Sequence, residues 1–144
     1  MIFDKLESGF WLRLKRGEPV VESLTRFAKE QEITAAGISG IGAVTGASLG
    51  YFDLTRREYN RKKFDGVYEL LNLAGNISLV DGNPFVHAHV IVAGPDYQTL
   101  GGHLFEAEVA VTVEIILRVF PQAVSRKFDP DINLNLWNLS SCLE

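Results

Sequence analysis

The feature that most limits the fold is the apolar run at residues 33–54, ITAAGISGIGAVTGASLGYFDL, which contains five glycines. Each glycine inside a helix costs about 1 kcal/mol relative to alanine, so one long helix is disfavoured here. In a strand, glycine marks a bulge or a close approach of two backbones. The run lacks both GxxxxGK[ST] and a clean GxGxxG before a helix, so it does not indicate a phosphate-binding loop. We therefore predict strands with bulges in this region. The glycines are Gly37, Gly40, Gly42, Gly46 and Gly50.

Several other segments have the pattern of β-strands. Residues 9–16, GFWLRLKR, alternate between apolar and polar side chains, which is typical of a half-buried strand. Two β-rich runs, 67–80 and 84–93, are separated by the turn signal Asp81-Gly82-Asn83-Pro84. Residues 101–120 are expected to form two strands or one bent strand, and the tail at 127–139 a last edge strand.

One segment, residues 18–31, has the apolar periodicity of an amphipathic helix. Pro19 suits its first turn, and Leu24, Phe27 and Ala28 recur on one face. Short adjacent strands with turn signals favour a mainly antiparallel sheet. With one principal helix packed on that sheet, the predicted class is α+β, in a single domain over residues 1–144.

Composition excludes several classes of protein. The chain has 47% hydrophobic and 22% charged residues, which is typical of a globular domain. No run approaches the roughly 20 apolar residues of a membrane-spanning helix, and the first residues do not resemble a signal peptide. Its one cysteine, Cys142, cannot form an intrachain disulfide. We therefore expect a cytoplasmic protein that does not bind membranes. Cys142 is also too terminal for a catalytic nucleophile.

All three histidines of the chain lie between residues 87 and 103, in VHAHVIVAGPDYQTLGGHL. His87 and His89 are two apart, so a strand would place both on one face. His103 follows Gly101-Gly102, where the missing side chains permit close approach of backbone or ligand. If the strand of His103 pairs with that of His87 and His89, the three imidazoles converge.

A three-histidine cluster with one open position is a known zinc arrangement. The ligands alone do not select zinc over another divalent transition metal such as nickel or copper. Glu106 and Glu108 are near in sequence, but strand alternation places both on the face opposite His103. An alternative to a metal centre is a polar pocket or a pH-sensitive structural cluster.

Residues 56–63, RREYNRKK, contain five of the fourteen basic residues. They could contact nucleic-acid phosphates, with Tyr59 as a stacking group. The preferred interpretation is a solvated hairpin whose charges discourage edge-to-edge strand pairing. The formal net charge of −4 gives no general attraction to nucleic acid. The candidate contacts are Arg56, Arg57, Arg61, Lys62 and Lys63.

Three stretches together resemble the plant and prokaryote conserved (PPC) domain family. They are AAGISGIGAVTGASLGYFD at 35–53, YELLNLAGNISLVDGNPFVHAHV at 68–90 and GGHLFEAEV at 101–109. The resemblance implies an antiparallel sheet with one main helix, a homotrimer, binding of partner proteins, and a metal site at His87, His89 and His103. Prokaryotic members are often labelled DNA-binding because plant members carry AT-hooks. This sequence contains no Arg-Gly-Arg-Pro core of an AT-hook.

The sequence therefore leaves three hypotheses for function. The favoured one is a non-enzymatic, metal-binding homotrimer that binds a partner or small ligand. The alternative is a zinc-dependent enzyme, a hydrolase or hydratase, that uses a metal-bound water. The third is a regulator associated with DNA through the basic segment.

Overall fold

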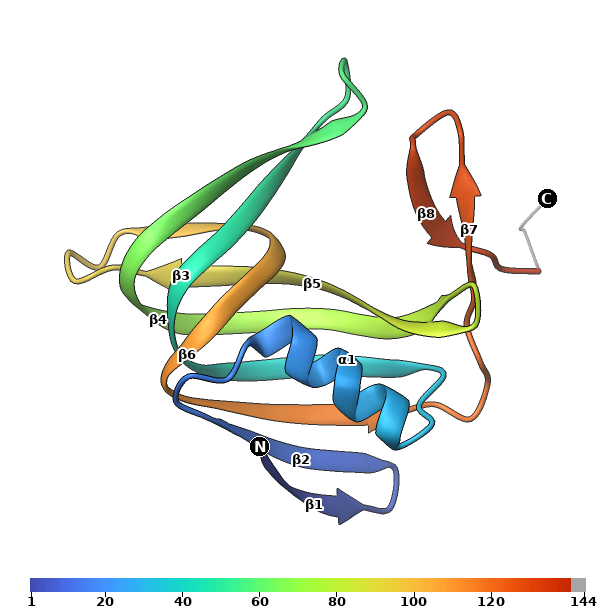
Figure 1. Cartoon of the computed structure of the whole chain (residues 1–144), viewed down its shortest axis with the longest axis horizontal. Helices are drawn as coiled ribbons and strands as arrows, with labels where there is room; N and C mark the ends of the chain where they lie inside the picture. The colour runs from blue at the N-terminus through green and yellow to red at the C-terminus, as the bar shows by residue number, and fades with distance from the viewer. Residues whose placement is uncertain (141–144) are drawn as a thin grey trace.

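The computed structural model describes residues 1–140 and contains eight strands and one helix (Figure 1). Cys142 lies outside the described residues. The antiparallel class and the single principal helix agree with the prediction. The elements are β1 (Ile2–Leu6), β2 (Gly9–Lys15), α1 (Val20–Glu30), β3 (Ala36–Asp53), β4 (Glu58–Val80), β5 (Asn83–Ala93), β6 (Thr99–Val119), β7 (Arg126–Asp129) and β8 (Leu134–Trp137).

The main sheet has six strands in the order β1-β2-β6-β3-β4-β5, and all neighbours are antiparallel. In addition, β5 pairs with the first part of β6, so that β6, β3, β4 and β5 form a closed ring. One long bent strand, β6, makes this closure (Figure 1). Of the two predicted possibilities, two strands or one bent strand, the structure shows one bent strand. It brings residues near 87–93 beside residues 99–103.

The glycines of β3 mark irregularities of the sheet, as predicted. The register between β3 and β4 shifts between Gly40 and Gly42 and again between Thr45 and Ala47. Gly46 has φ +60°, in the left-handed region that glycine tolerates best. A Cβ at Gly42 would lie 2.1 Å from the carbonyl oxygen of Thr112, so β3 and β6 approach too closely there for any side chain.

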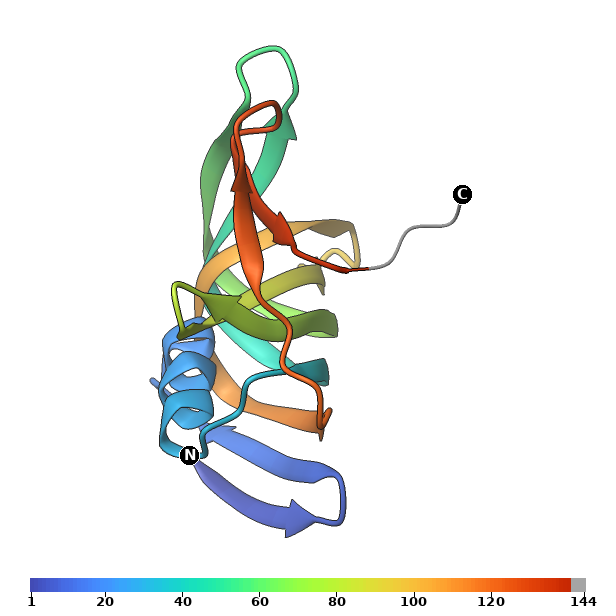
Figure 2. The same ribbon diagram turned by 90° about the vertical axis from the view of Figure 1, so that its right-hand side faces the viewer.

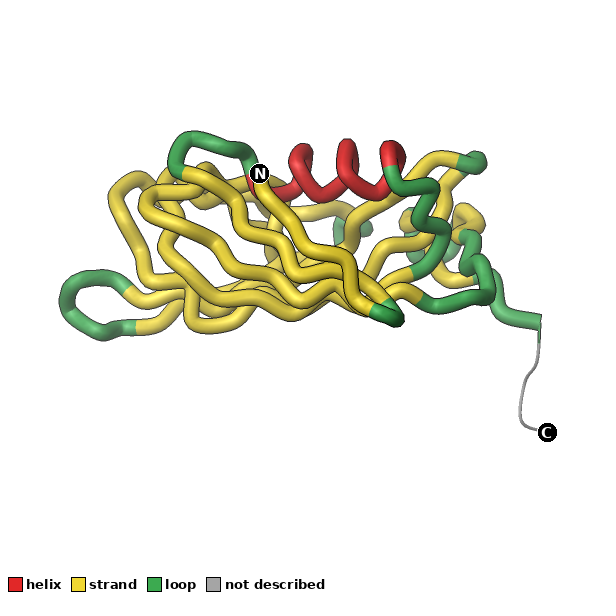
Figure 3. Tube along the Cα trace, turned by 90° about the horizontal axis from the view of Figure 1, so that it is seen from below, coloured by secondary structure: helices red, strands yellow, loops and turns green. Residues whose placement is uncertain are grey.

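Helix α1 covers one face of the sheet, and Figure 3 shows the other face without a helix. Its buried residues Val20, Leu24, Phe27 and Ala28 pack into the core. The helix is slightly shorter than the predicted 18–31, because Pro19 is extended and occupies the N-cap position rather than the first turn. No helix among residues 1–140 has the length and apolar character needed to cross a membrane.

The tail does not add an edge strand to the main sheet, so that prediction was wrong. Strands β7 and β8 pair with each other in a separate hairpin, which we call the arm (residues 126–137). The physical reason is a local turn, in which the carboxylate of Asp129 accepts hydrogen bonds from the backbone N–H groups of Asp131 and Ile132. Figures 1 and 2 show the arm beside the β3–β4 turn, and the side-chain amide of Asn133 donates to the carbonyl of Arg57 at 3.0 Å.

Candidate metal centre

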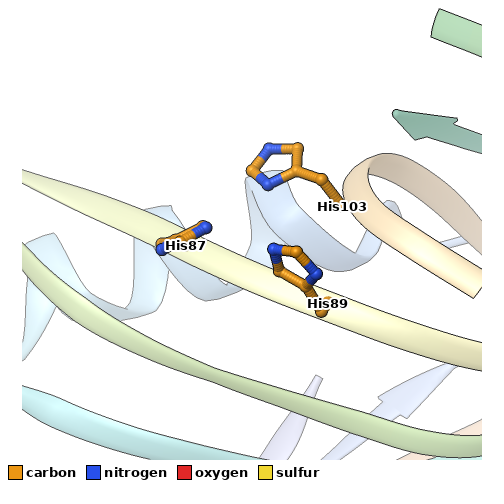
Figure 4. Close-up of side chains that lie close together, drawn as sticks. All are labelled: His87, His89 and His103. Carbon is orange, nitrogen blue, oxygen red and sulfur yellow. The ribbon is translucent and has the colours of Figure 1, made fainter. Parts of the chain in front are cut away.

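The three histidines meet on one side of the closed ring. His87 and His89 project from the same face of β5, and His103 on β6 is the register partner of His89. One potential ligand nitrogen from each residue lies within 4.8 Å of the other two. Ring centroids are 5.2 to 5.4 Å apart, and Figure 4 shows the rings facing a common space. This is the convergence that the sequence predicted, and such a group could bind a metal ion.

Glycines hold the three strands of the site close together. A Cβ at Gly101 would lie 2.5 Å from the carbonyl oxygen of Val90 on β5. A Cβ at Gly102 would lie 2.8 Å from the carbonyl oxygen of Gly50 on β3. The pair Gly101-Gly102 therefore lets β6 pass between β5 and β3 without a clash, and it delivers His103 to the cluster.

Two of the three imidazoles, His87 and His103, have lowered pKa values, which favours the neutral form that a metal requires. Burial lowers the pKa of His103 to about 4, with further contributions from His87, His89 and Arg126. Burial, followed by Arg126 and His89, also lowers the pKa of His87. Neutral imidazole is the ligand form, so a metal need not displace a proton at neutral pH.

An unsatisfied nitrogen of His103 is a second observation that fits a metal ion at this site. The Nδ1 atom of His103 is buried and has no hydrogen-bond partner among residues 1–140. A buried polar atom without a partner costs free energy, so such atoms are rare unless a ligand or ion satisfies them. Three imidazoles, one with an unsatisfied nitrogen, match the ligands that zinc and similar divalent transition metals prefer.

Arg126 of the arm is a residue of the site that the sequence did not reveal. Its guanidinium donates to the hydroxyl of Ser78 at 2.7 Å, the amide oxygen of Asn76 at 2.9 Å and the carbonyl of Asn135 at 2.9 Å. It also lies 3.3 Å from Nδ1 of His87. Asn76 and Ser78 thus fix a cation beside the histidines. No motif near Arg126 indicates this role, because the contact depends on how the arm folds.

Two aromatic side chains, Tyr59 and Phe105, pack against His103. The ring of Tyr59 lies 4.6 Å from that of His103, and the ring of Phe105 lies 4.9 Å from it. Tyr59 was considered as a stacking group for nucleic acid, but here it packs on the histidine cluster. Gly50 makes room for this arrangement, since a Cβ there would lie 2.6 Å from the Phe105 ring and 2.8 Å from the Tyr59 ring.

Glu106 has a structural contact that the sequence did not reveal. Its carboxylate accepts hydrogen bonds from the backbone N–H groups of Val21 at 2.8 Å and Glu22 at 3.0 Å. The side chain therefore caps the N-terminus of α1, where Pro19 provides no side-chain cap. Glu108 is exposed. Among the described residues, the group that could hold a metal consists of the three histidines and includes neither carboxylate.

Four of the five basic residues of 56–63 have local side-chain contacts, including Lys62, whose Nζ lies 4.9 Å from the centroid of the Phe64 ring. Arg56 lies 4.0 Å from the Asp53 carboxylate, and Lys63 lies 3.8 Å from that of Asp65. Arg61 donates to the Ser48 hydroxyl and its guanidinium carbon lies 4.5 Å from the Phe105 ring centroid. Strand alternation directs Lys62 away from Arg61 and Lys63. Arg57 lies in the exposed β3–β4 turn. The segment therefore does not present its cations on one face.

Comparison with known families agrees with the fold and the site. The sequence profile of the Plants and Prokaryotes Conserved (PCC, also written PPC) domain matches residues 2–121. The chain belongs to this family. The match confirms the resemblance seen in the sequence. Arg126 and the rest of the arm lie beyond the matched residues.

Solved structures similar to this PCC domain include a metal-containing protein of Archaeoglobus fulgidus. It is 40% identical with a TM-score of 0.85, over 96% of this chain and 99% of that one. A plant- and prokaryote-conserved protein of Pyrococcus horikoshii is 36% identical with a TM-score of 0.87, over 98% and 97% of the two chains. A proposed DNA-binding protein of Bacteroides thetaiotaomicron is 30% identical with a TM-score of 0.92, over 95% and 96%.

Curated relatives include the bifunctional protein GlmU from two Synechococcus strains. The identities are 34% over 122 residues and 33% over 108 residues. The matched segments make up 18% and 16% of those proteins, so this PCC domain spans less than a fifth of their length.

Proposed function

We propose that this PCC domain is a zinc-binding protein that holds the ion with His87, His89 and His103 and acts by binding rather than by catalysis. The observation that carries the proposal is the convergence of three imidazoles, including the unsatisfied Nδ1 of His103. The metal-containing relative from Archaeoglobus fulgidus supports it. Zinc is preferred because three histidines with an open position are typical of it, and another divalent transition metal is the alternative. A cytoplasmic location is part of the proposal.

A binding role is favoured over an enzymatic one by the groups around the cluster. A zinc-dependent hydrolase or hydratase would use the ion as a Lewis acid and needs a general base within reach of the open position. The Glu106 carboxylate is held by the start of α1. No Asp or Glu of the described chain lines the pocket beside His87 and His103. Chelator-sensitive turnover of an ester, amide or phosphate would support the enzyme instead.

The domain is further proposed to assemble as a homotrimer through the sheet face that α1 leaves bare. Trp11 on β2 is the register partner of Ile116 on β6, and Ile41 on β3 is the partner of Glu114, two residues before Ile116. The exposed fractions of Trp11, Ile116 and Ile41 are 56%, 56% and 58%. They line a hollow of about 810 Å³ with Ile2, and the charged residues Asp4, Arg13 and Glu114 also line it. Apolar patches of this kind mark protein interfaces. Because the family resemblance implies a homotrimer, we propose that further copies of this chain cover this face.

Association with nucleic acid is the weaker alternative. The Bacteroides thetaiotaomicron relative is a proposed DNA-binding protein, and a trimer would present three copies of Arg56, Arg57, Arg61, Lys62 and Lys63. Against it stand the net charge of −4 and the local contacts of those cations.

The first experiment tests the metal site itself. Metal analysis of protein purified without a histidine tag should give close to one ion per chain.

A further inference from the structure

A pocket of about 350 Å³ lies between the histidine cluster and the arm. His87 and His103 line it on one side, and the arm forms the opposite wall. The volume falls within the range of small-molecule sites, which combine apolar walls with a few convergent polar groups. The polar lining includes Arg126 and Tyr59. The apolar lining includes Phe85, Phe105, Phe128, Leu134 and Leu136.

Arg126 gives this pocket a fixed positive charge. The guanidinium is protonated at all relevant pH values, and its hydrogen bonds to Asn76, Ser78 and Asn135 hold it in place. It therefore adds a cation beside three imidazoles that we propose to hold a second cation. None of the described residues that line the pocket is an Asp or Glu that would balance these charges. An anion from outside the chain would balance them.

The contact between Arg126 and His87 points to the same ligand chemistry. A guanidinium has only N–H donors, so without a metal Nδ1 of His87 acts as the acceptor at 3.3 Å and Nε2 carries the ring proton. A neutral histidine that binds a metal through Nε2 carries its proton on Nδ1. Both groups would then present donors to each other. An oxygen of an anion can accept from both, as carboxylates do beside many metal-bound histidines.

We propose that this pocket binds a small organic carboxylate. The carboxylate lies against Arg126 and the metal site, and an apolar body of about the size of one ring packs between Phe85, Phe128 and Leu134. The apolar walls favour this class over inorganic phosphate, which has no surface to bury there. This inference rests on the proposed metal site.

Calorimetric titration of the zinc-loaded protein with benzoate tests the proposal. We expect a dissociation constant below about 1 mM, equivalent to a little over 4 kcal/mol. Benzamide has the same ring without the charge, and acetate has the same charge with almost no apolar body. Both should bind at least about tenfold more weakly if charge and ring each contribute about 1.4 kcal/mol or more.

Variants of the arm separate the charge from the cavity. Arg126→Gln should weaken benzoate binding by at least about tenfold, and the zinc content of the variant is measured in the same experiment. Lys127→Gln is the matched control, because it removes an exposed cation from the adjacent position of β7. Leu134→Trp keeps Arg126 but fills the pocket, and it should abolish binding. This second variant keeps the test decisive if Arg126→Gln loosens the arm.

The outcomes distinguish the pocket from the metal site. The carboxylate pocket is overturned if zinc-loaded wild-type protein does not bind benzoate. It is also overturned if neither Arg126→Gln nor Leu134→Trp weakens benzoate binding. Both outcomes leave the metal site standing. Wild-type protein that binds no zinc, yet binds benzoate in a manner that depends on Arg126, overturns the metal site and leaves the pocket standing.

Discussion

His89 on β5 lies directly opposite His103 on β6 in the antiparallel register. The same pairing closes the ring of β6, β3, β4 and β5. The candidate metal centre therefore bridges the two strands at the closure. A metal bound by both histidines would link strands that are joined in sequence only through the turn after β5.

The first prediction is that His89→Ala removes the metal without harming the fold. His89 is exposed, so its loss should change the free energy of unfolding of metal-free protein by less than about 0.5 kcal/mol. Metal content of tag-free protein should fall from about one ion per chain to near zero, because two imidazoles bind far more weakly than three. Ile91→Ala is the matched control, since Ile91 projects from the same face of β5. Full metal content in His89→Ala would contradict the ligand assignment.

The second prediction concerns acid stability of the metal-free protein. The pKa of His103 is about 4 in the folded state and near 6.5 when unfolded, so the unfolded chain binds more protons between these values. Stability should therefore fall as the pH decreases from about 6.5 to about 4, by roughly 2 to 3 kcal/mol from this residue. His87, whose pKa is also lowered, adds to the loss. Urea unfolding at a series of pH values measures it.

His103→Phe provides the control for this pH dependence. Phenylalanine retains an aromatic ring against Tyr59 and Phe105 but has no proton to bind. The acid loss of stability should be smaller in this variant. An unchanged pH profile would show that His103 is not the buried titrating group.

The sequence could predict the shared face of two histidines and the close approach of His103, because strand alternation and glycine geometry are local properties. Two histidines at i and i+2 share a face in any strand. Gly101-Gly102 indicated the close approach that the structure shows on both sides of β6. What the sequence left open was the order of the strands, because pairing between β5 and β6 depends on the bend of β6 and the closure of the ring.

Arg126 and Glu106 could not have been predicted in the same way. Arg126 reaches Asn76 and Ser78 on β4 only because the arm forms its own hairpin instead of an edge strand. The contact of Glu106 with the start of α1 links residues far apart in the sequence. Both contacts are set by tertiary structure.

The third prediction is that Glu106 contributes to stability rather than to metal binding. Glu106→Ala leaves the N–H groups of Val21 and Glu22 without their acceptor, which should cost about 1 to 2 kcal/mol of unfolding free energy. Zinc content should not change. Glu108→Ala, at an exposed position on the same strand, should cost less than about 0.5 kcal/mol. A normal urea midpoint in Glu106→Ala would contradict this capping role, and loss of zinc would place Glu106 at the metal.

The fourth prediction concerns DNA. If the basic segment binds the phosphate backbone, affinity should fall steeply with salt, and Arg61→Ala with Lys62→Ala should reduce both affinity and salt dependence. Because Arg61 is engaged by Ser48 and Phe105, we expect little or no binding even at low salt. Fluorescence anisotropy with a labelled duplex at low salt measures this. Tight binding that the double variant abolishes would favour the DNA-associated alternative.

The last prediction concerns assembly. Trp11→Glu places a charge in the exposed apolar face formed by Trp11, Ile41 and Ile116, where a second copy of the chain would have to desolvate it. In sedimentation, wild-type protein at micromolar concentration should have three times the 16.0 kDa mass of one chain. The variant should sediment as a single chain. Tyr97→Ser is the matched control, because Tyr97 is 90% exposed but lies in the turn between β5 and β6. A wild-type protein that sediments at 16.0 kDa would refute the trimer, since the apolar face would then stay open to solvent.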